Sequence, residues 1–190
     1  MKYNKMERLI AWFRYEKVIS VLKKHQGGVM VDIGCGTDGT LLNNVEQYLS
    51  VGYGFDRDVP VDFINDGSKI KLNHIDDLHA GLDLADESAD NVTLLAVFEH
   101  LEKPEVILAE CHRILKPGGR LICTVPTWMA KPILEFMAFK LKVIDVDSIE
   151  DHKRYYSKKQ LREFAETKFT TEKCQYFELG VNCFGVFVKD

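Results

Sequence analysis

Residues 31–39 read Val-Asp-Ile-Gly-Cys-Gly-Thr-Asp-Gly, and this stretch decides the fold. Its three glycines, Gly34, Gly36 and Gly39, form a G-x-G-x-x-G pattern after the apolar run at 29–33 and before a helical stretch. A glycine-rich turn between a strand and a helix is typical of a loop that binds a nucleoside. The stretch therefore predicts an α/β fold with a nucleoside at its first turn.

The charge of Asp32, two positions before the first glycine, narrows the choice of nucleoside. A carboxylate there would repel the phosphates of a dinucleotide, whereas it would stabilise a ligand with a positive charge. S-adenosylmethionine (SAM) has no phosphate and carries an ammonium and a sulfonium group. Asp32 therefore favours SAM over NAD.

Apolar spacing predicts helices and strands in alternation on both sides of the loop. An amphipathic helix is expected over 5–25, because apolar residues recur there every three or four positions, and Gly27-Gly28 end it. Pro104 suits the first turn of a later helix, which Pro117-Gly118-Gly119 are expected to end. The other expected elements are strands at 29–33, 51–55, 90–97 and 120–125, and a helix at 39–49.

The stretch 57–82 is harder to interpret, because Pro60 and Asn65-Asp66-Gly67 interrupt a weak helical pattern. We expect a shortened or irregular helix there and a third strand at 70–75, with 61–64 as the alternative for that strand.

The C-terminal third predicts a last helix and a hairpin. Ser157-Lys158-Lys159-Gln160 has the spacing of a capping box, and strands at 169–179 and 182–188 are joined through Gly180. Together these patterns predict a doubly wound, mostly parallel seven-stranded α/β sheet with an antiparallel C-terminal hairpin strand. The 190 residues are expected to form one domain, with an N-terminal helix in 1–28 and an insert at 127–156 that shapes the acceptor pocket.

Further motifs follow the glycine loop in a familiar order. Gly54-Phe55-Asp56 ends the second strand, 89–95 leads to Phe98-Glu99-His100-Leu101, and Arg113–Gly119 leads to a strand that ends at Pro126. Over residues 29–126 the chain resembles the class I SAM-dependent methyltransferases, in the type 11-like group that acts on small molecules, lipids and glycans.

The resemblance implies SAM as cofactor and S-adenosylhomocysteine as product. Asp32 would hold the ammonium group, and Asp56 would accept the ribose hydroxyls. An acid after the third strand would meet the adenine: Asp76 is favoured, Asp77 also qualifies, and Asp66 qualifies if the strand lies at 61–64. The remaining expected cofactor-binding residues are Gly34, Cys35, Gly36, Arg57 and Ala96.

Methyl transfer needs a base only where the acceptor must lose a proton. His100 and His152 are the candidate bases, since histidine titrates near neutral pH. No metal is expected. Leu95-Ala96-Val97-Phe98 stands where families that methylate exocyclic amines or amide nitrogens carry Asn-Pro-Pro-Tyr or Asp-Pro-Pro-Tyr. Oxygen is therefore favoured over nitrogen as the acceptor atom.

The composition argues against some classes of binding partner. Lys plus Arg is 25 and Asp plus Glu is 29, which gives a net charge of −4 and no basic block for nucleic acid. No run of 18 apolar residues or secretory signal is visible, and five cysteines show no C-x-x-C pair, so we expect a cytoplasmic protein with reduced thiols. The apolar stretch 132–143 either covers an acceptor or touches a membrane surface, or packs as an ordinary helix. A monomer and a homodimer both stay open.

Two other classes of protein also fit part of the sequence. A partner subunit could bind SAM without chemistry, because Asp32, Gly34, Gly36 and Asp56 indicate binding and not turnover. An NAD-dependent oxidoreductase would fit the glycines but not Asp32 or the Lys-Pro-Gly-Gly turn.

Overall fold

The computed structural model describes residues 5–25, 28–65, 67–135 and 153–190. Its strands are β1 (Val29–Ile33), β2 (Val51–Asp56), β3 (Ile70–His74), β4 (Ala89–Leu95), β5 (Leu115–Pro126), β6 (Thr170–Phe177) and β7 (Asn182–Val188). They form one sheet in the order β3-β2-β1-β4-β5-β7-β6. The first five strands pair in parallel, and β7 runs antiparallel to β5 and to β6. The predicted α/β sheet with its antiparallel C-terminal hairpin is confirmed.

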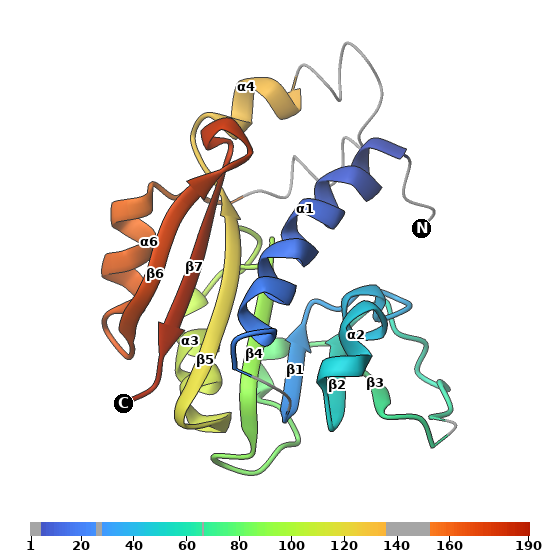
Figure 1. Cartoon of the computed structure of the whole chain (residues 1–190). Helices are drawn as coiled ribbons and strands as arrows, with labels where there is room; N and C mark the ends of the chain where they lie inside the picture. The colour runs from blue at the N-terminus through green and yellow to red at the C-terminus, as the bar shows by residue number, and fades with distance from the viewer. Residues whose placement is uncertain (1–4, 26–27, 66, 136–152) are drawn as a thin grey trace.

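Helices cover both faces of this sheet (Figure 1). α1 (Lys5–Leu22) and α2 (Thr40–Val45) pack on one face, and α3 (Pro104–Ile114) and α6 (Lys158–Ala165) pack on the other. The short helix α4 (Ala130–Glu135) follows β5. Three 3-10 turns complete the described elements: η1 (Glu46–Tyr48), η2 (Leu78–Ala80) and η4 (Glu178–Gly180).

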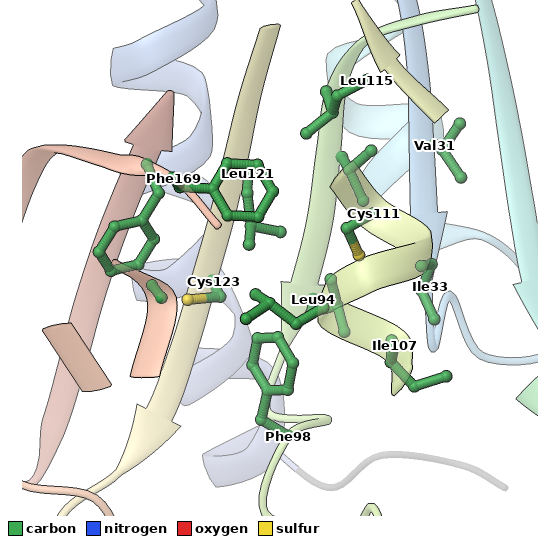
Figure 2. Packing of buried hydrophobic residues seen from close by; sticks show 14 of the residues in the cluster. Val31, Ile33, Leu94, Phe98, Ile107, Cys111, Leu115, Leu121, Cys123 and Phe169 are labelled. Carbon is green, nitrogen blue, oxygen red and sulfur yellow. The ribbon is translucent and has the colours of Figure 1, made fainter. Parts of the chain in front are cut away.

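The two faces bury separate apolar clusters. Figure 2 shows the cluster beside α3, in which Ile107 and Cys111 lie among Leu94, Phe98 and Cys123 from the fourth strand, the loop after it and the fifth strand. Val18 and Leu22 of α1 share the opposite cluster with Ile122 of β5 and Phe184 of β7. Each large apolar side chain that is fully buried stabilises the fold by roughly 1.5–3 kcal/mol. β4 and β5, which carry the site described below, are thus fixed by packing from both sides.

The end of α3 differs from its prediction. The helix ends at Ile114, three residues before Pro117-Gly118-Gly119, and Leu115 is already extended with φ −71° and ψ 138°. Proline disfavours the helical conformation in Lys116 before it, and Leu115 is already extended because it belongs to β5. Leu115 then pairs with Ala89, and the register shifts before Asn91.

The connection between β2 and β3 contains no helix in its described residues, so the shortened helix expected there is absent from them. The third strand lies at Ile70–His74, and the alternative at 61–64 is wrong. The side chain of Asn65 takes the position of a neighbouring strand: its Oδ1 accepts from Leu72 N at 2.9 Å and its Nδ2 donates to Leu72 O at 3.3 Å.

The capping box is confirmed at the start of α6. Gln160 N donates to Ser157 Oγ at 3.2 Å, and Ser157 N donates to Gln160 Oε1 at 2.9 Å. The hairpin turns through η4, where Glu178, Leu179 and Gly180 all have positive φ. No helix within the described ranges is both long enough and apolar enough to cross a membrane.

The strand order reverses between β1 and β4. From β1 the chain moves outward to β2 and β3, and it then returns to build β4 and β5 on the other side. In open α/β sheets, ligands bind outside the carboxyl ends of the strands at such a point. The glycine loop at 34–39 and the loop after β4 both begin there.

Candidate active site

The first turn of the fold depends on glycine. Gly34 and Gly36 have φ of 80° and 69°, in the left-handed region that disfavours side chains. A Cβ on Gly34 would lie 2.4 Å from Val97 Cγ2, in the loop after β4. Gly34 N donates to Phe55 O at 2.8 Å and ties the turn to β2. Glycine here lets two loops from either side of the switch point approach closely.

Asp56 anchors the glycine loop through its carboxylate. Gly36 N donates to Asp56 Oδ2 at 2.8 Å, and Asp58 N donates to Asp56 Oδ1 at 2.9 Å. A carboxylate offers about four lone pairs, so further donors can still bind both oxygens. In a dinucleotide site the loop amides would face a pyrophosphate, whereas here a carboxylate already accepts from one of them. The residues present therefore fit a phosphate-free nucleoside with hydroxyl donors.

Asp32 lies buried between β1 and β4, with 3% of its surface exposed. Thr93 Oγ1 donates to Asp32 Oδ1 at 2.5 Å. Burial raises the pKa of Asp32 to about 7, the nearby Asp56 charge adds to the rise, and the hydrogen bond from Thr93 opposes it. A cation beside Asp32 would favour its ionised form.

The end of β4 is strained. Ala96 has φ 58°, although it carries a Cβ, and a non-glycine residue in this region costs roughly 1–2 kcal/mol. Ala96 N donates to Thr124 O at 3.0 Å, which helps to hold the conformation. His100 follows in the same loop, where its backbone N donates to Val97 O at 3.0 Å. Strain of this kind clusters at ligand sites.

The acids after β3 are more exposed than Asp32 and Asp56. The Asp76 side chain is 93% exposed, and its Oδ1 lies 3.0 Å from His74 Nε2. Asp77 caps η2 by accepting from His79 N at 2.9 Å, and this hydrogen bond lowers the pKa of Asp77. Both acids follow the carboxyl end of β3, yet each already holds a histidine.

The other predicted residues differ in exposure, and two of them lie outside the described residues. Arg57 is exposed. Cys35 is buried, and a Cβ on Gly54 of β2 would lie 2.7 Å from its Sγ, so any contact of Cys35 with a cofactor would use its backbone. Asp66 and His152 lie outside the described residues.

Glu99 lies in the loop after β4, and the sequence pattern assigned it no role of its own. It is 1% exposed, and its Oε2 has no hydrogen-bond partner within the described structure. Burial raises its pKa to about 7. Nearby, the Tyr156 hydroxyl also lacks a partner there, and burial raises the pKa of Tyr156 to about 12. The available signal was an acid between Phe98 and His100 in a short loop at a strand's carboxyl end.

The sequence matches known methyltransferases. Residues 31–123 match the model of a family described as "Methyltransferase domain". The chain is 38% identical over 61 residues to a ubiquinone/menaquinone biosynthesis C-methyltransferase of Rubrivivax gelatinosus, covering 30% of this chain and 24% of that protein. It is 30% identical over 115 residues to a ubiquinone biosynthesis O-methyltransferase of Cereibacter sphaeroides, covering 58% and 46%. The chain spans less than half the length of these two relatives.

Solved structures share the fold at low identity. A protein from Pyrococcus horikoshii superposes with a TM-score of 0.72 at 18% identity, over 98% of this chain and 93% of that one. A chain from a complex of the Haloferax volcanii Trm112 methyltransferase activator and a methyltransferase superposes with a TM-score of 0.67 at 17% identity, over 100% and 99%. Motifs, relatives and fold agree, and the chain belongs to the class I SAM-dependent methyltransferase family.

Proposed function

We propose that this chain transfers the methyl group of SAM to a small-molecule, lipid-linked or glycan-type acceptor, at an oxygen atom. The main support for the proposal is the pair of carboxylates at the first turn of the fold. Asp56 accepts from Gly36 N at 2.8 Å, and Asp32 lies buried nearby under the influence of the Asp56 charge. Two carboxylates at a nucleoside loop favour a ligand that has positive charge and no phosphate.

The proposed roles follow the chemistry of each group. Asp32 holds the ammonium group of SAM, directly or through water, and Asp56 accepts the ribose hydroxyls. The exposed backbone at Gly34 lets the ligand approach, and the loop that begins at Ala96 lines the cleft between SAM and acceptor. Asp76 or Asp77 meets the adenine.

Bound SAM supplies a methyl group on a positively charged sulfur, which is already an excellent leaving group. The main task of the chain is to align the acceptor oxygen with that methyl group, and orientation of this kind can contribute up to about 7–11 kcal/mol. The proton of an acceptor hydroxyl must leave as the O–CH₃ bond forms. His100 and His152 are the predicted proton acceptors.

The acceptor class draws on two further observations. The relatives matched above are named for methyl transfer to oxygen and to carbon in quinone biosynthesis, which supports a small molecule as the acceptor. The segment Leu95–Phe98 lacks the pattern that binds planar nitrogens, which favours oxygen.

Calorimetry and a transfer assay test the proposal. The chain should bind SAM and S-adenosylhomocysteine with micromolar affinity and give no response to NAD. It should then form S-adenosylhomocysteine in the presence of hydroxylated acceptors. Tight NAD binding would contradict the cofactor, and SAM binding with no transfer to any acceptor in a broad extract screen would indicate a non-catalytic subunit.

A further inference from the structure

Two cysteine sulfurs lie next to each other on the last two strands of the sheet. Cys174 Sγ of β6 is 3.9 Å from Cys183 Sγ of β7, and either thiol can donate to the other. Cys174 pairs with Gly185, which lies two residues after Cys183 on the same strand. Residues two apart on a strand share a face, so the two cysteines are diagonal neighbours. The hairpin thus brings together two nucleophilic groups that have no part in the candidate active site.

The two thiols differ in their access to water. Cys183 is 0% exposed and belongs to the apolar cluster that also contains Leu161 of α6. Cys174 packs against the same cluster but is only partly buried, on the outermost strand of the sheet beside α6 (Figure 1). A small solute therefore reaches Cys174 before it reaches Cys183.

The surroundings of Cys174 favour its thiolate form. Its Sγ lies at the first turn of α6, 3.6 Å from Lys158 O. The hydrogen bond with Cys183 lowers the pKa of Cys174, and the charges of Lys158 and Arg162 add to the fall, whereas partial burial and the charge of Glu166 oppose it. The same hydrogen bond and burial raise the pKa of Cys183. Because the thiolate is the nucleophilic form, Cys174 is the more reactive of the two at neutral pH.

We propose that Cys174 and Cys183 are a peroxide-sensitive thiol pair, in which Cys174 is oxidised first and Cys183 then closes a disulfide between β6 and β7. Cysteines that sense oxidants are typically accessible to solvent and lie beside a second thiol, as Cys174 does. This oxidation does not depend on the proposed methyl transfer, and it makes the C-terminal hairpin a site of reversible modification.

Hydrogen peroxide supplies the oxidising equivalents in two steps. The Cys174 thiolate attacks one peroxide oxygen, the O–O bond breaks, and the hydroxide that leaves takes a proton to become water. The Cys174 sulfur is now a sulfenic acid and has lost two electrons to the peroxide. The Cys183 sulfur loses its proton and attacks the sulfenic sulfur, so that the S–S bond forms as the S–O bond breaks. The second hydroxide takes up that proton, and two thiols and one peroxide have become one disulfide and two waters.

Closing the disulfide requires a small movement of β6. A disulfide bond is about 2.05 Å long, so the two sulfurs must approach each other by roughly 2 Å. β6 pairs with β7 on one side only, and its register shifts between Thr171 and Lys173, just before Cys174. An outer strand with an irregular register can move while it loses few hydrogen bonds. Diagonal neighbours lie further apart than most bridged cysteines, so we expect a strained bond that is easily reduced.

Mass spectrometry of the full chain tests the pair. The reduced chain is treated with hydrogen peroxide, denatured, alkylated and cleaved after Glu178, which separates the two cysteines in the sequence. We expect two thiols to be lost per chain, in two peptides that are joined through Cys174 and Cys183 and that dithiothreitol separates. A link from Cys174 to Cys123, a disulfide-linked dimer, or five thiols that stay free at millimolar peroxide would overturn the inference.

Single variants separate the roles of the two cysteines. Cys183→Ala should leave Cys174 as a sulfenic acid that dimedone labels, whereas Cys174→Ser should form neither the label nor the disulfide. Cys111→Ala removes a buried cysteine of α3 and should oxidise like the native chain. Dimedone labelling of another cysteine in Cys183→Ala would contradict the order of the two steps.

A matched pair of lysines tests why Cys174 reacts first, without any peroxide. In the folded native chain, iodoacetamide at neutral pH should alkylate Cys174 before any other cysteine. Lys158→Gln removes a charge that favours the thiolate and should slow this reaction about twofold or more. Lys159→Gln, at the neighbouring exposed lysine that pairs with Glu163, should leave the rate unchanged. Equal rates in the three chains, or slow alkylation of Cys174 in the native chain, would overturn its reactive role.

Discussion

At the scale of the residue, two carboxyl groups dominate the carboxyl edge of the sheet. Asp32 and Glu99 flank β4, one paired with Thr93 and the other with an unpartnered Oε2 within the described chain. Burial raises the pKa of each to about 7. Both groups therefore change charge close to neutral pH, where ordinary carboxyl groups are fully ionised.

Asp32 should release a proton when a cationic nucleoside binds. Near pH 6.5 much of Asp32 is protonated in the free chain, and an ammonium group beside it favours the ionised form. Calorimetry of S-adenosylhomocysteine binding in buffers of different ionisation enthalpy should detect this proton. Asp32→Asn should abolish the release and weaken binding about tenfold or more, whereas Asp38→Asn, at an exposed acid of the same loop, should do neither. An unchanged proton count in Asp32→Asn would contradict the role.

Glu99 should make stability depend on pH. Its folded pKa of about 7 lies above the ordinary value of 4.5, so the unfolded chain ionises first and stability is lost as pH rises between these values. The full shift corresponds to about 3 kcal/mol. Glu99→Gln removes this loss. Urea unfolding should show the variant gaining about 2 kcal/mol on the native chain between about pH 5 and about pH 8. A difference that does not vary with pH would contradict the prediction.

Gly34 should tolerate no side chain. Gly34→Ala places a Cβ at 2.4 Å from Val97 Cγ2 and strains a φ of 80°. Gly67→Ala is the matched control, since Gly67 has φ 85° and nothing within 4 Å of the added Cβ. Both variants carry the backbone cost of roughly 1–2 kcal/mol, and only Gly34→Ala adds the clash. Urea unfolding should rank Gly34→Ala lower in stability, and adding Val97→Ala should recover part of the difference.

At the scale of the element, strands and caps could be predicted because their signals are local. The apolar run at 29–33 and the Ser157–Gln160 spacing need only a few neighbouring residues to specify a strand and a cap. Pro117-Gly118-Gly119 was expected to end α3, but the helix already ends at Ile114 because Leu115 pairs with Ala89 of β4.

Removing the cap of α6 should cost a small, defined amount. Ser157→Ala loses the hydrogen bond that Gln160 N donates to Ser157 Oγ and should destabilise the chain by about 1 kcal/mol in urea unfolding. Ser157→Asp keeps an acceptor at the same position and should stay within a few tenths of the native value. Equal losses in both variants would show that the hydroxyl acts in another way.

At the scale of the whole molecule, a mostly parallel sheet with an antiparallel C-terminal strand could be predicted from alternating strands and helices, but the burial of Glu99 could not. Asp32 and Asp56 were recognisable because they lie at fixed distances from the glycine loop. Glu99 meets a segment that is far away in the chain, since Lys153 N donates to Glu99 O at 2.9 Å. No local pattern distinguishes Glu99 from an ordinary loop residue.

The side chain of Asn65 has a consequence for how molecules of this chain meet one another. It satisfies both backbone groups of Leu72 on the outermost strand, which would otherwise be open to a strand from a second molecule. Asn65→Ala should therefore promote aggregation on concentration, detectable by light scattering, while Asn73→Ala on the same strand should not. At Leu72 the sheet is therefore closed to a strand from a second molecule, whereas β6 forms its opposite edge.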